Sequence, residues 1–235
     1  MNRSRPALIV FCREPIPHLT KTRLIGKLTA DAAARLADAF IVDALGKAGS
    51  VRASRVVIAA SAPEGAANSK YFRRLARRFR TELIDQGRGS LGARMSRALE
   101  PFASSGALLI GTDTPSLPAS LLEKSIGALA RSRVVIAPSL DGGYYAIGVR
   151  GAMPPIFTAI RWGSGDVLDA TIRRLQRARI RYALGPAWYD VDRWSDVMLL
   201  AAHRYLQRGE RRASASPCPA TDAVLKQLGL LSDPR

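Results

Sequence analysis

One carboxylate, Asp113, follows directly after the apolar run at residues 107–111 and precedes Pro115. If that run is a strand of an open α/β sheet, its carboxyl end faces the ligand crevice. A hard cation such as Mg²⁺ or Mn²⁺ takes one or two protein carboxylates and completes its shell with phosphate and water. We therefore predict that Asp113 is a catalytic and metal-binding residue. The alternative is that it caps a helix beginning at Ser116 or Ala119, although Ser116 can itself serve as that cap.

Three cations, Arg13, Lys21 and Arg23, follow the apolar run at residues 7–11 within a dozen positions. Charge-assisted hydrogen bonds to phosphate are strong, and a guanidinium can make two of them at once. We predict that these side chains bind a diphosphate. No glycine precedes Gly26 in this loop, so it is neither a P-loop nor a dinucleotide fingerprint. A solvated surface loop is the alternative.

A second acidic segment contains Asp190 and Asp192. Residues two apart on an extended segment point the same way, which makes Asp192 a candidate second metal ligand. Asp is also common at helix N-termini, so capping of the following helix is an equal alternative.

The segment at residues 141–145 has the sequence of a tight turn. We predict that Asp141 is catalytic, because its carboxylate can orient or deprotonate an acceptor hydroxyl. Gly142 and Gly143 allow close backbone approach, and we assign them, with Tyr144 and Trp162, to acceptor binding. The alternatives are an ordinary hairpin turn for Asp-Gly and core packing for Trp162.

Alternating short apolar runs and helical patterns must position these residues, which predicts an α/β fold with a mainly parallel central sheet flanked by helices on both faces. We expect strands at residues 7–11, 55–60, 81–84, 107–111, 134–137, 144–149 and 180–184. We expect helices at residues 30–47, 71–80, from 92 to 99, around 122–129, after a Ser164 cap, at 195–207 and at 221–230, with Thr29 or Asp31 capping the first. The prediction is a single domain over residues 1–207, followed at 208–235 by a basic linker and a small helix.

Composition limits the class of protein. The chain has 235 residues, 47% of them hydrophobic, and no run approaches the ~20 apolar residues of a membrane helix. The first apolar run is too short for a secretory signal, and Cys12 and Cys218 suit a reducing compartment, so we expect a cytoplasmic protein.

The net charge is +17. No aromatic platform or helix-turn-helix accompanies it, so we expect solvated basic helices and no nucleic-acid partner. A non-enzymatic basic protein that binds nucleotides or nucleic acid remains a third hypothesis. The sequence does not specify the oligomeric state.

The motifs as a set resemble a family of uncharacterised bacterial proteins assigned to the GT-A, or nucleotide-diphospho-sugar transferase, superfamily. The resemblance covers about residues 7–200. It is carried by Leu8-Ile-Val-Phe, Pro15-x-Pro17, Lys21-Thr-Arg-Leu24, Leu91-Gly-x-Arg-Met95, Gly111-Thr-Asp-Thr-Pro115, Asp141-Gly-Gly-Tyr-Tyr145, Trp162-Gly-Ser and Asp190-Val-Asp192.

The resemblance implies a Rossmann-like GT-A fold that binds a nucleoside-diphosphate compound with Mg²⁺ or Mn²⁺. Lys21 and Arg23 then fall in the phosphate loop and Asp113 at the superfamily's metal position, and we add Gly92 and Arg94 as nucleotide- or phosphate-binding residues. The chain departs from the family in carrying Arg13 in place of Lys, His18 in place of Gly, and one Asp in place of Asp-x-Asp.

We therefore expect a metal-dependent glycosyltransferase that uses a nucleotide sugar and an acceptor that the sequence does not identify. The Lys-Thr-Arg-Leu loop and the Asp113 segment also resemble the 2-phospholactate guanylyltransferases of the same superfamily. A nucleotidyltransferase that joins a nucleoside monophosphate to a phosphate acceptor is therefore the second hypothesis. The Asp-Gly-Gly-Tyr-Tyr turn resembles the first family more closely than the guanylyltransferases, and this resemblance favours sugar transfer.

Overall fold

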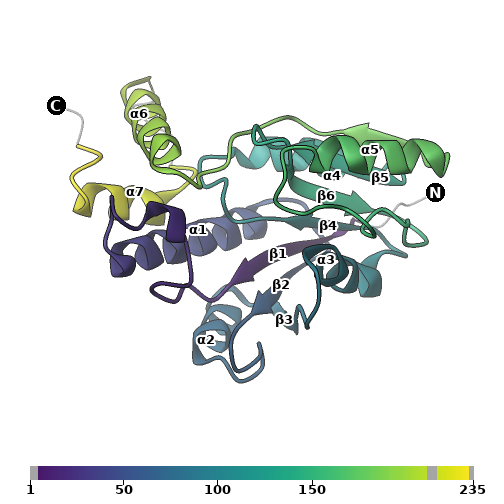
Figure 1. Cartoon of the computed structure of the whole chain (residues 1–235), viewed down its shortest axis with the longest axis horizontal. Coiled ribbons are helices and arrows are strands. Elements are labelled where there is room, and N and C mark those ends of the chain that lie inside the picture. The colour runs from purple at the N-terminus through teal and green to yellow at the C-terminus, as the bar shows by residue number, and fades with distance from the viewer. Residues whose placement is uncertain (1–4, 211–215, 233–235) are drawn as a thin grey trace.

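A computed structural model of the chain describes residues 5–210 and 216–232. In this part of the chain, seven strands form one sheet in the order β3-β2-β1-β4-β6-β5-β7 (Figure 1). The strands are β1 (Ala7–Arg13), β2 (Arg55–Ser61), β3 (Glu82–Asp85), β4 (Ala107–Ile110), β5 (Val134–Pro138), β6 (Tyr144–Val149) and β7 (Tyr182–Leu184). Only β6 runs antiparallel to its neighbours β4 and β5. The predicted mainly parallel sheet is confirmed.

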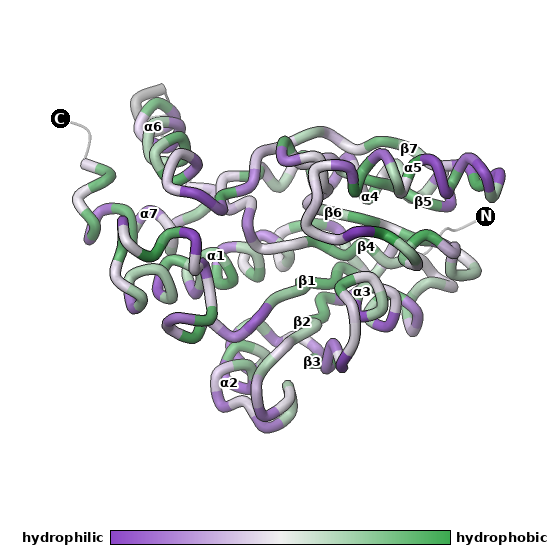
Figure 2. The backbone as a smooth tube through the Cα atoms, in the orientation of Figure 1, coloured by the Kyte–Doolittle hydropathy of each residue, from purple (hydrophilic) through white to green (hydrophobic). Residues whose placement is uncertain are grey.

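Helices cover both faces of this sheet, as predicted. The helices are α1 (Ala30–Ser50), α2 (Lys70–Phe79), α3 (Leu91–Leu99), α4 (Ala119–Leu129), α5 (Val167–Arg177), α6 (Trp194–Glu210) and α7 (Pro219–Gln227), with short 3-10 turns η1 (Thr22–Leu24) and η2 (Glu100–Phe102). Alternate residues of β1 point to opposite faces. Leu8 and Val10 join the core beneath α1, α2 and α4, whereas Ile9 joins the core beneath α3 and α5. Figure 2 shows hydrophobic residues along the central strands and hydrophilic residues along α5.

The strand order reverses between β1 and β4. From β1 the chain moves outward through β2 and β3, and it then returns to place β4 on the other side of β1. Ligands of open α/β sheets bind at such a reversal, outside the carboxyl ends of the strands. The loops after β1 and β4 carry Lys21 and Asp113, so the fold brings the two predicted segments to one edge.

Helix caps confirm one prediction and correct another. Thr29 caps α1, because its hydroxyl accepts the Ala32 N–H at 3.1 Å. Ser164 does not cap α5, which begins two residues later than expected, after Asp166. The Ser164 hydroxyl instead donates to the Arg161 carbonyl within its own turn. The Gly142 carbonyl accepts the Leu168 N–H at 2.9 Å, so the neighbouring turn satisfies the start of this helix.

The C-terminal helix packs against the body of the domain. A third hydrophobic cluster joins η1, α1, α6 and α7 through Leu24, Phe40, Val197 and Leu225. In Figure 1, α7 lies beside α1 and α6 projects from the same end. Of the predicted linker, the first residues belong to α6, and residues 211–215 lie outside the described residues. The proposed division at residue 207 remains a prediction.

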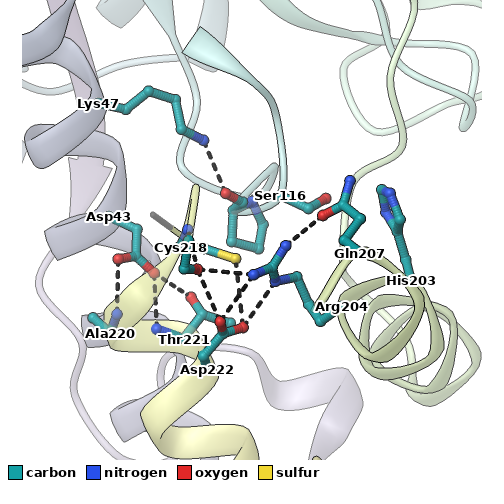
Figure 3. A network of polar contacts seen from close by, with 12 residues as sticks. Asp43, Lys47, Ser116, His203, Arg204, Gln207, Cys218, Ala220, Thr221 and Asp222 are labelled. Carbon is teal, nitrogen blue, oxygen red and sulfur yellow. Dashed lines mark hydrogen bonds and ion pairs between the residues drawn. The ribbon is translucent and has the colours of Figure 1, made fainter. Parts of the chain in front are cut away.

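Buried polar side chains fix α7 to α1 (Figure 3). Asp43 of α1 is only 4% exposed. Its carboxylate accepts the N–H groups of Ala220 and Thr221 at 2.9 and 2.8 Å and the Thr221 hydroxyl at 2.6 Å. The first backbone donors of a helix have no partner within the helix, so a side chain from α1 supplies the cap of α7.

The same network extends from α1 to the loop after β4. Lys47 of α1 donates to the carbonyl oxygens of Pro115 at 2.8 Å and of Thr114 at 3.4 Å. Burial lowers the pKa of Lys47 to about 8. On the other side, Arg204 of α6 makes a two-point contact with Asp222 of α7 at 2.9 and 3.0 Å (Figure 3). These contacts tie three helices to the segment that carries Asp113. No helix within residues 5–210 and 216–232 is both long enough and apolar enough to cross a bilayer.

We predict that Asp43→Ala lowers the free energy of unfolding by about 2–4 kcal/mol, because two buried N–H groups of α7 lose their acceptor. Urea denaturation measures the change. The exposed Arg35→Ala on the same helix is the control and should stay within about 0.5 kcal/mol of the parent protein. Equal effects of the two substitutions would contradict the capping role of Asp43.

A pH dependence follows from Lys47. Its pKa is about 8 in the folded protein and 10.5 by default in an unfolded chain. Between these values the unfolded chain binds more protons, so the contribution of Lys47 to stability rises with pH. We expect the stability difference between the parent and Lys47→Met to shift in favour of the parent from about pH 7.5 to about pH 9.5. A difference that stays constant across this range would refute the prediction.

Candidate functional site

The ammonium of Lys21 lies between two carboxylates at the carboxyl edge of the sheet. Its Nζ atom is 2.7 Å from Oδ1 of Asp113 and 2.8 Å from Oδ1 of Asp192. It also donates to the Val191 carbonyl at 2.7 Å. The Lys21 side chain is 7% exposed. An ammonium has three N–H donors, and each finds an acceptor here.

Local backbone geometry and packing place Lys21. Its φ and ψ of 50° and 39° are left-handed, a conformation that costs a non-glycine residue roughly 1–2 kcal/mol. The next residues form η1, where Leu24 is buried in the third hydrophobic cluster. The Nζ atom also lies 5.4 Å from the ring centre of Phe40. His18 also has a positive φ, at 64°, a value that glycine adopts more readily than other residues.

Asp113 is held by the chain segment that carries Asp192. The Asp113 carbonyl accepts the Val191 N–H at 2.8 Å. Nearby, the Ser116 hydroxyl donates to Tyr189 Oη at 2.7 Å and accepts from Trp188 Nε1 at 3.2 Å. Residues 188–192 are therefore joined to the loop after β4 at several points.

Neither predicted metal ligand caps a helix. The residue that precedes α4 is Pro118, and Asp113 points to Lys21 instead. At the start of α6, Asp196 accepts the N–H groups of Asp192 and Arg193 at 3.0 and 2.7 Å. The Asp192 carboxylate is thus left to face Lys21 and, at 3.4 Å, Arg23. The capping alternatives for both carboxylates are wrong.

Charges dominate this edge. Burial alone would lower the pKa of Lys21, but Asp113 and Asp192 outweigh it, and the pKa is raised. Burial would raise the pKa of Asp192, but the positive charges of Lys21 and Arg23 hold it below its usual value. The ammonium and the Asp192 carboxylate are therefore both ionised near neutral pH.

Asp190 lies two residues before Asp192, and no functional role was predicted for it. Burial raises its pKa to about 6, and the negative charges of Asp141, Asp192 and Asp113 add to that effect. Carboxylates that follow β4, β5 and β7 therefore converge within electrostatic reach of one another. The two-residue spacing from Asp192 was the only sequence signal for Asp190.

The donor set fits the chemistry of a hard divalent cation, because Asp113 and Asp192 supply carboxylate oxygens. Among the described residues, however, no three His, Cys, Asp or Glu side chains are arranged to hold a metal ion. The Lys21 ammonium takes the position between the two carboxylates. The metal-binding role of Asp113 and Asp192 thus stays a prediction, and it requires that Lys21 move.

Arg13 and Arg94 form a second cationic group. Arg13 is exposed at the end of β1, and after burial its charge is the next cause that lowers the pKa of Arg94. The Arg94 guanidinium lies over the Phe11 ring and donates to the Gln86 side chain. Its Nε atom is buried without a hydrogen-bond partner among the described residues.

Gln86 was missed by the sequence analysis. Its Nε2 atom donates to the carbonyls of Cys12 and Ala59 at 2.9 and 2.7 Å, which fixes the side chain that Arg94 contacts. No local sequence pattern marks a buried glutamine of this kind.

The glycines have packing roles. A Cβ atom on Gly92 would lie 2.3 Å from the Phe157 carbonyl oxygen and 2.7 Å from Cζ2 of Trp162. Gly142 has φ at +85°, and a Cβ there would meet the Gly165 carbonyl oxygen at 1.9 Å. Glycine is required at both positions by neighbouring protein atoms, and their roles toward a ligand remain predictions.

The residues predicted to bind the acceptor lie close together, and some of them already contact other protein groups. Tyr144 and Trp162 pack edge to face with ring centres 6.4 Å apart. Asp141 lies in the turn between antiparallel β5 and β6, where its Oδ1 accepts the Gly143 N–H at 2.9 Å and the Ser139 hydroxyl. The segment is therefore a turn, as the alternative interpretation predicted, and hydrogen bonds within this turn occupy one carboxylate oxygen of Asp141.

A shallow hollow of about 930 Å³ lies at the α2 side of this edge. It is lined by Glu14, Lys70, Tyr71, Arg73, Arg74 and Arg77. The carboxylate cluster does not line it. The basic face of α2 is therefore a feature separate from the Lys21 site.

Solved structures share this architecture. A protein from Desulfovibrio desulfuricans G20, provisionally assigned as a nucleotide-diphospho-sugar transferase, is 28% identical, has a TM-score of 0.81 and aligns over 97% of this chain and 96% of its own. A cytidylyltransferase from Leptospira borgpetersenii serovar Hardjo-bovis is 11% identical with a TM-score of 0.54, covering 99% and 98%. Glucosyl-3-phosphoglycerate synthase from Mycobacterium tuberculosis, in complex with Mn²⁺, UDP and glucosyl-3-phosphoglycerate, is 10% identical with a TM-score of 0.50, covering 99% and 82%.

The last two similarities establish the fold alone. The 28% identical structure is described as a transferase, which agrees with the enzyme class expected from the sequence. No curated protein matches the chain significantly. A family model described as an uncharacterised protein conserved in bacteria (DUF2064) matches residues 41–164, more than half of the chain, and the chain belongs to this family.

Proposed function

We propose that this protein is a metal-dependent glycosyltransferase that binds a nucleoside-diphosphate sugar at the edge between β1 and β4. The observation that carries the proposal is the Lys21 ammonium held between Asp113 and Asp192. A cation next to two carboxylates, at the reversal of strand order, is suited to a diphosphate accompanied by a divalent metal ion. The 28% identical transferase-assigned structure supports the same class of substrate.

The diphosphate would be bound by Lys21, Arg23 and Arg13. The Arg23 side chain is 61% exposed, so it can turn toward a ligand without loss of a buried contact. Lys21 acts as a point charge, whereas each guanidinium can make two parallel hydrogen bonds to a phosphate. Arg94 and Gly92 extend this group toward the nucleoside.

Asp113 and Asp192 would hold Mg²⁺ or Mn²⁺. When bound, such an ion stabilises the negative charge that develops on the leaving diphosphate. The complex of glucosyl-3-phosphoglycerate synthase with Mn²⁺ and UDP supports the choice of metal. The cationic side chains of the β1 loop would add to the same electrostatic stabilisation.

The acceptor would bind against the turn at residues 141–144 and Trp162. Asp141 keeps one carboxylate oxygen for an acceptor hydroxyl, because its hydrogen bonds within the turn use Oδ1. In this role Asp141 orients the hydroxyl and accepts its proton. The protein would act in the cytoplasm, where nucleotide sugars are available.

A nucleotidyltransferase is the second candidate function. The structural similarity to a cytidylyltransferase favours it, as does the Lys-Thr-Arg-Leu sequence of the β1 loop. The same cationic side chains would then bind a nucleoside triphosphate. Pyrophosphate would leave when the nucleoside monophosphate is joined to a phosphate acceptor.

A thermal-shift experiment tests the proposal. With Mn²⁺ present, the protein is heated with nucleoside diphosphates, nucleoside triphosphates and sugar nucleotides in turn. A ligand at about a hundred times its Kd should add about 2.7 kcal/mol of stability. We expect sugar nucleotides and diphosphates to stabilise the parent protein and Asp113→Asn to lose most of this effect.

The matched control is Asp169→Asn on α5, whose carboxylate is exposed and pairs only with Arg173 among the described residues. It should retain the full ligand effect. Stabilisation by triphosphates alone would favour the nucleotidyltransferase. The absence of stabilisation by any nucleotide would rule out both functions.

Arg23→Ala should weaken binding of the nucleoside diphosphate about tenfold, because one charge-assisted contact is lost. Calorimetric titration at low salt measures the dissociation constant. Lys27→Ala, an exposed cation in the same loop, is the control and should change it less than about twofold. If the two variants weaken binding equally, Arg23 contributes only general charge and not a specific contact.

A further inference from the structure

The Lys21 ammonium occupies the place where a cation bound by Asp113 and Asp192 would lie. We propose that Lys21 is a displaceable internal counterion, which excludes a divalent cation from these two carboxylates in the nucleotide-free protein. The phosphate groups of the bound nucleotide then draw the ammonium away, and the carboxylates become available to the metal. This second step rests on the proposed function, whereas the exclusion itself does not.

The geometry makes the two cations mutually exclusive. The Nζ atom lies 2.7 and 2.8 Å from the inner oxygens of Asp113 and Asp192 and 2.7 Å from the Val191 carbonyl oxygen. A Mg²⁺ ion held between the same two Oδ1 atoms would need them at about 2.0–2.1 Å. An ammonium and a divalent ion cannot both lie between these oxygens, because the sites overlap and their like charges repel.

The two carboxylate side chains are far more exposed to solvent than Lys21. Their side chains are 45% exposed in Asp113 and 36% exposed in Asp192, whereas the Lys21 side chain is 7% exposed. A metal ion that arrives with a phosphate can therefore reach both carboxylates from solvent. The ammonium approaches them from the protein interior, above the Phe40 ring.

The chemistry of the Lys21 side chain allows its ammonium to move away from the two carboxylates. Its charge is at the end of a flexible four-carbon side chain, and phosphate oxygens offer it acceptors as strong as the carboxylates. Its left-handed backbone is strained, so relaxation of the loop before η1 would lower the free energy of the loop.

Arg23 does not share this role. It approaches Asp192 at 3.4 Å, makes no ion pair with Asp113, and its side chain is 61% exposed. It therefore serves as a matched control for removal of one positive charge near the site. The comparison separates a specific counterion from the general field of a chain with net charge +17.

The test is a titration of the nucleotide-free protein with Mn²⁺ alone. The electron paramagnetic resonance signal of free Mn²⁺ measures how much of the ion is bound. We expect Lys21→Met and Lys21→Gln to bind Mn²⁺ at least about tenfold more tightly than the parent, because the two carboxylates lose their counterion. Arg23→Met should gain less than about threefold. The double variant Lys21→Met/Asp113→Asn should lose the gain, which assigns the bound ion to these carboxylates.

The Tm is a second measurement, and it shows whether the Lys21 variants still fold. Lys21→Gln removes the charge but keeps an N–H donor, on a side chain that is one bond shorter. In metal-free buffer its Tm should be lower than that of the parent, and Mn²⁺ should raise it more than it raises the Tm of the parent. Equal Mn²⁺ affinity in the parent and both Lys21 variants, or an equal gain in Arg23→Met, would overturn the exclusion.

The nucleotide step is tested separately. With UDP as the probe, the ratio of Mn²⁺ dissociation constants without and with nucleotide should be at least about fivefold larger in the parent than in Lys21→Met, since the coupling is reciprocal. Equal ratios would overturn the displacement by phosphate. If the proposed function is wrong, no nucleotide will stabilise the protein in the thermal-shift experiment. The titration with Mn²⁺ alone would still test whether Lys21 excludes the metal ion.

Discussion

The contact of the Lys21 ammonium with Asp113 and Asp192 joins three loops that are distant in the sequence. Lys21 follows β1, Asp113 follows β4, and Asp192 follows β7. An ammonium buried to this extent is stable only if each of its N–H groups has an acceptor and its charge is balanced. The two carboxylates and the Val191 carbonyl meet both conditions. Opposite charges thus hold this edge of the site together.

The rest of the structure supports that contact from below. Leu24, Phe40 and Leu225 join η1, α1 and α7 in the third hydrophobic cluster, and the Phe40 ring centre lies 5.4 Å from the Lys21 Nζ atom. Asp43 fixes α7 on α1, and Lys47 holds the Pro115 carbonyl two residues after Asp113. The C-terminal helices therefore help to position the candidate site, although they follow the part of the chain that the family model matches.

The local elements were largely predictable because their signals are local. The apolar run at residues 107–111 predicted β4, and Thr29 was predicted as a cap of α1. Both predictions use only residues that are neighbours in the sequence. The cap of α5 was predicted wrongly, because the Gly142 carbonyl of a distant turn satisfies the first turn of that helix. Gln86 was missed for a similar reason, since its partners Cys12 and Ala59 belong to other strands.

The sequence by itself determined the class of fold, the acidic and basic residue types at the ends of its strands, and the segments in which they occur. Only the tertiary structure decided that Lys21 meets Asp192, 171 residues away, and that neither Asp113 nor Asp192 caps a helix. The physical reason is that hydrophobic periodicity and caps involve residues within a few positions of one another. Contacts between loops depend instead on the order of strands in the sheet and on the packing of α1, α6 and α7, which local patterns do not specify.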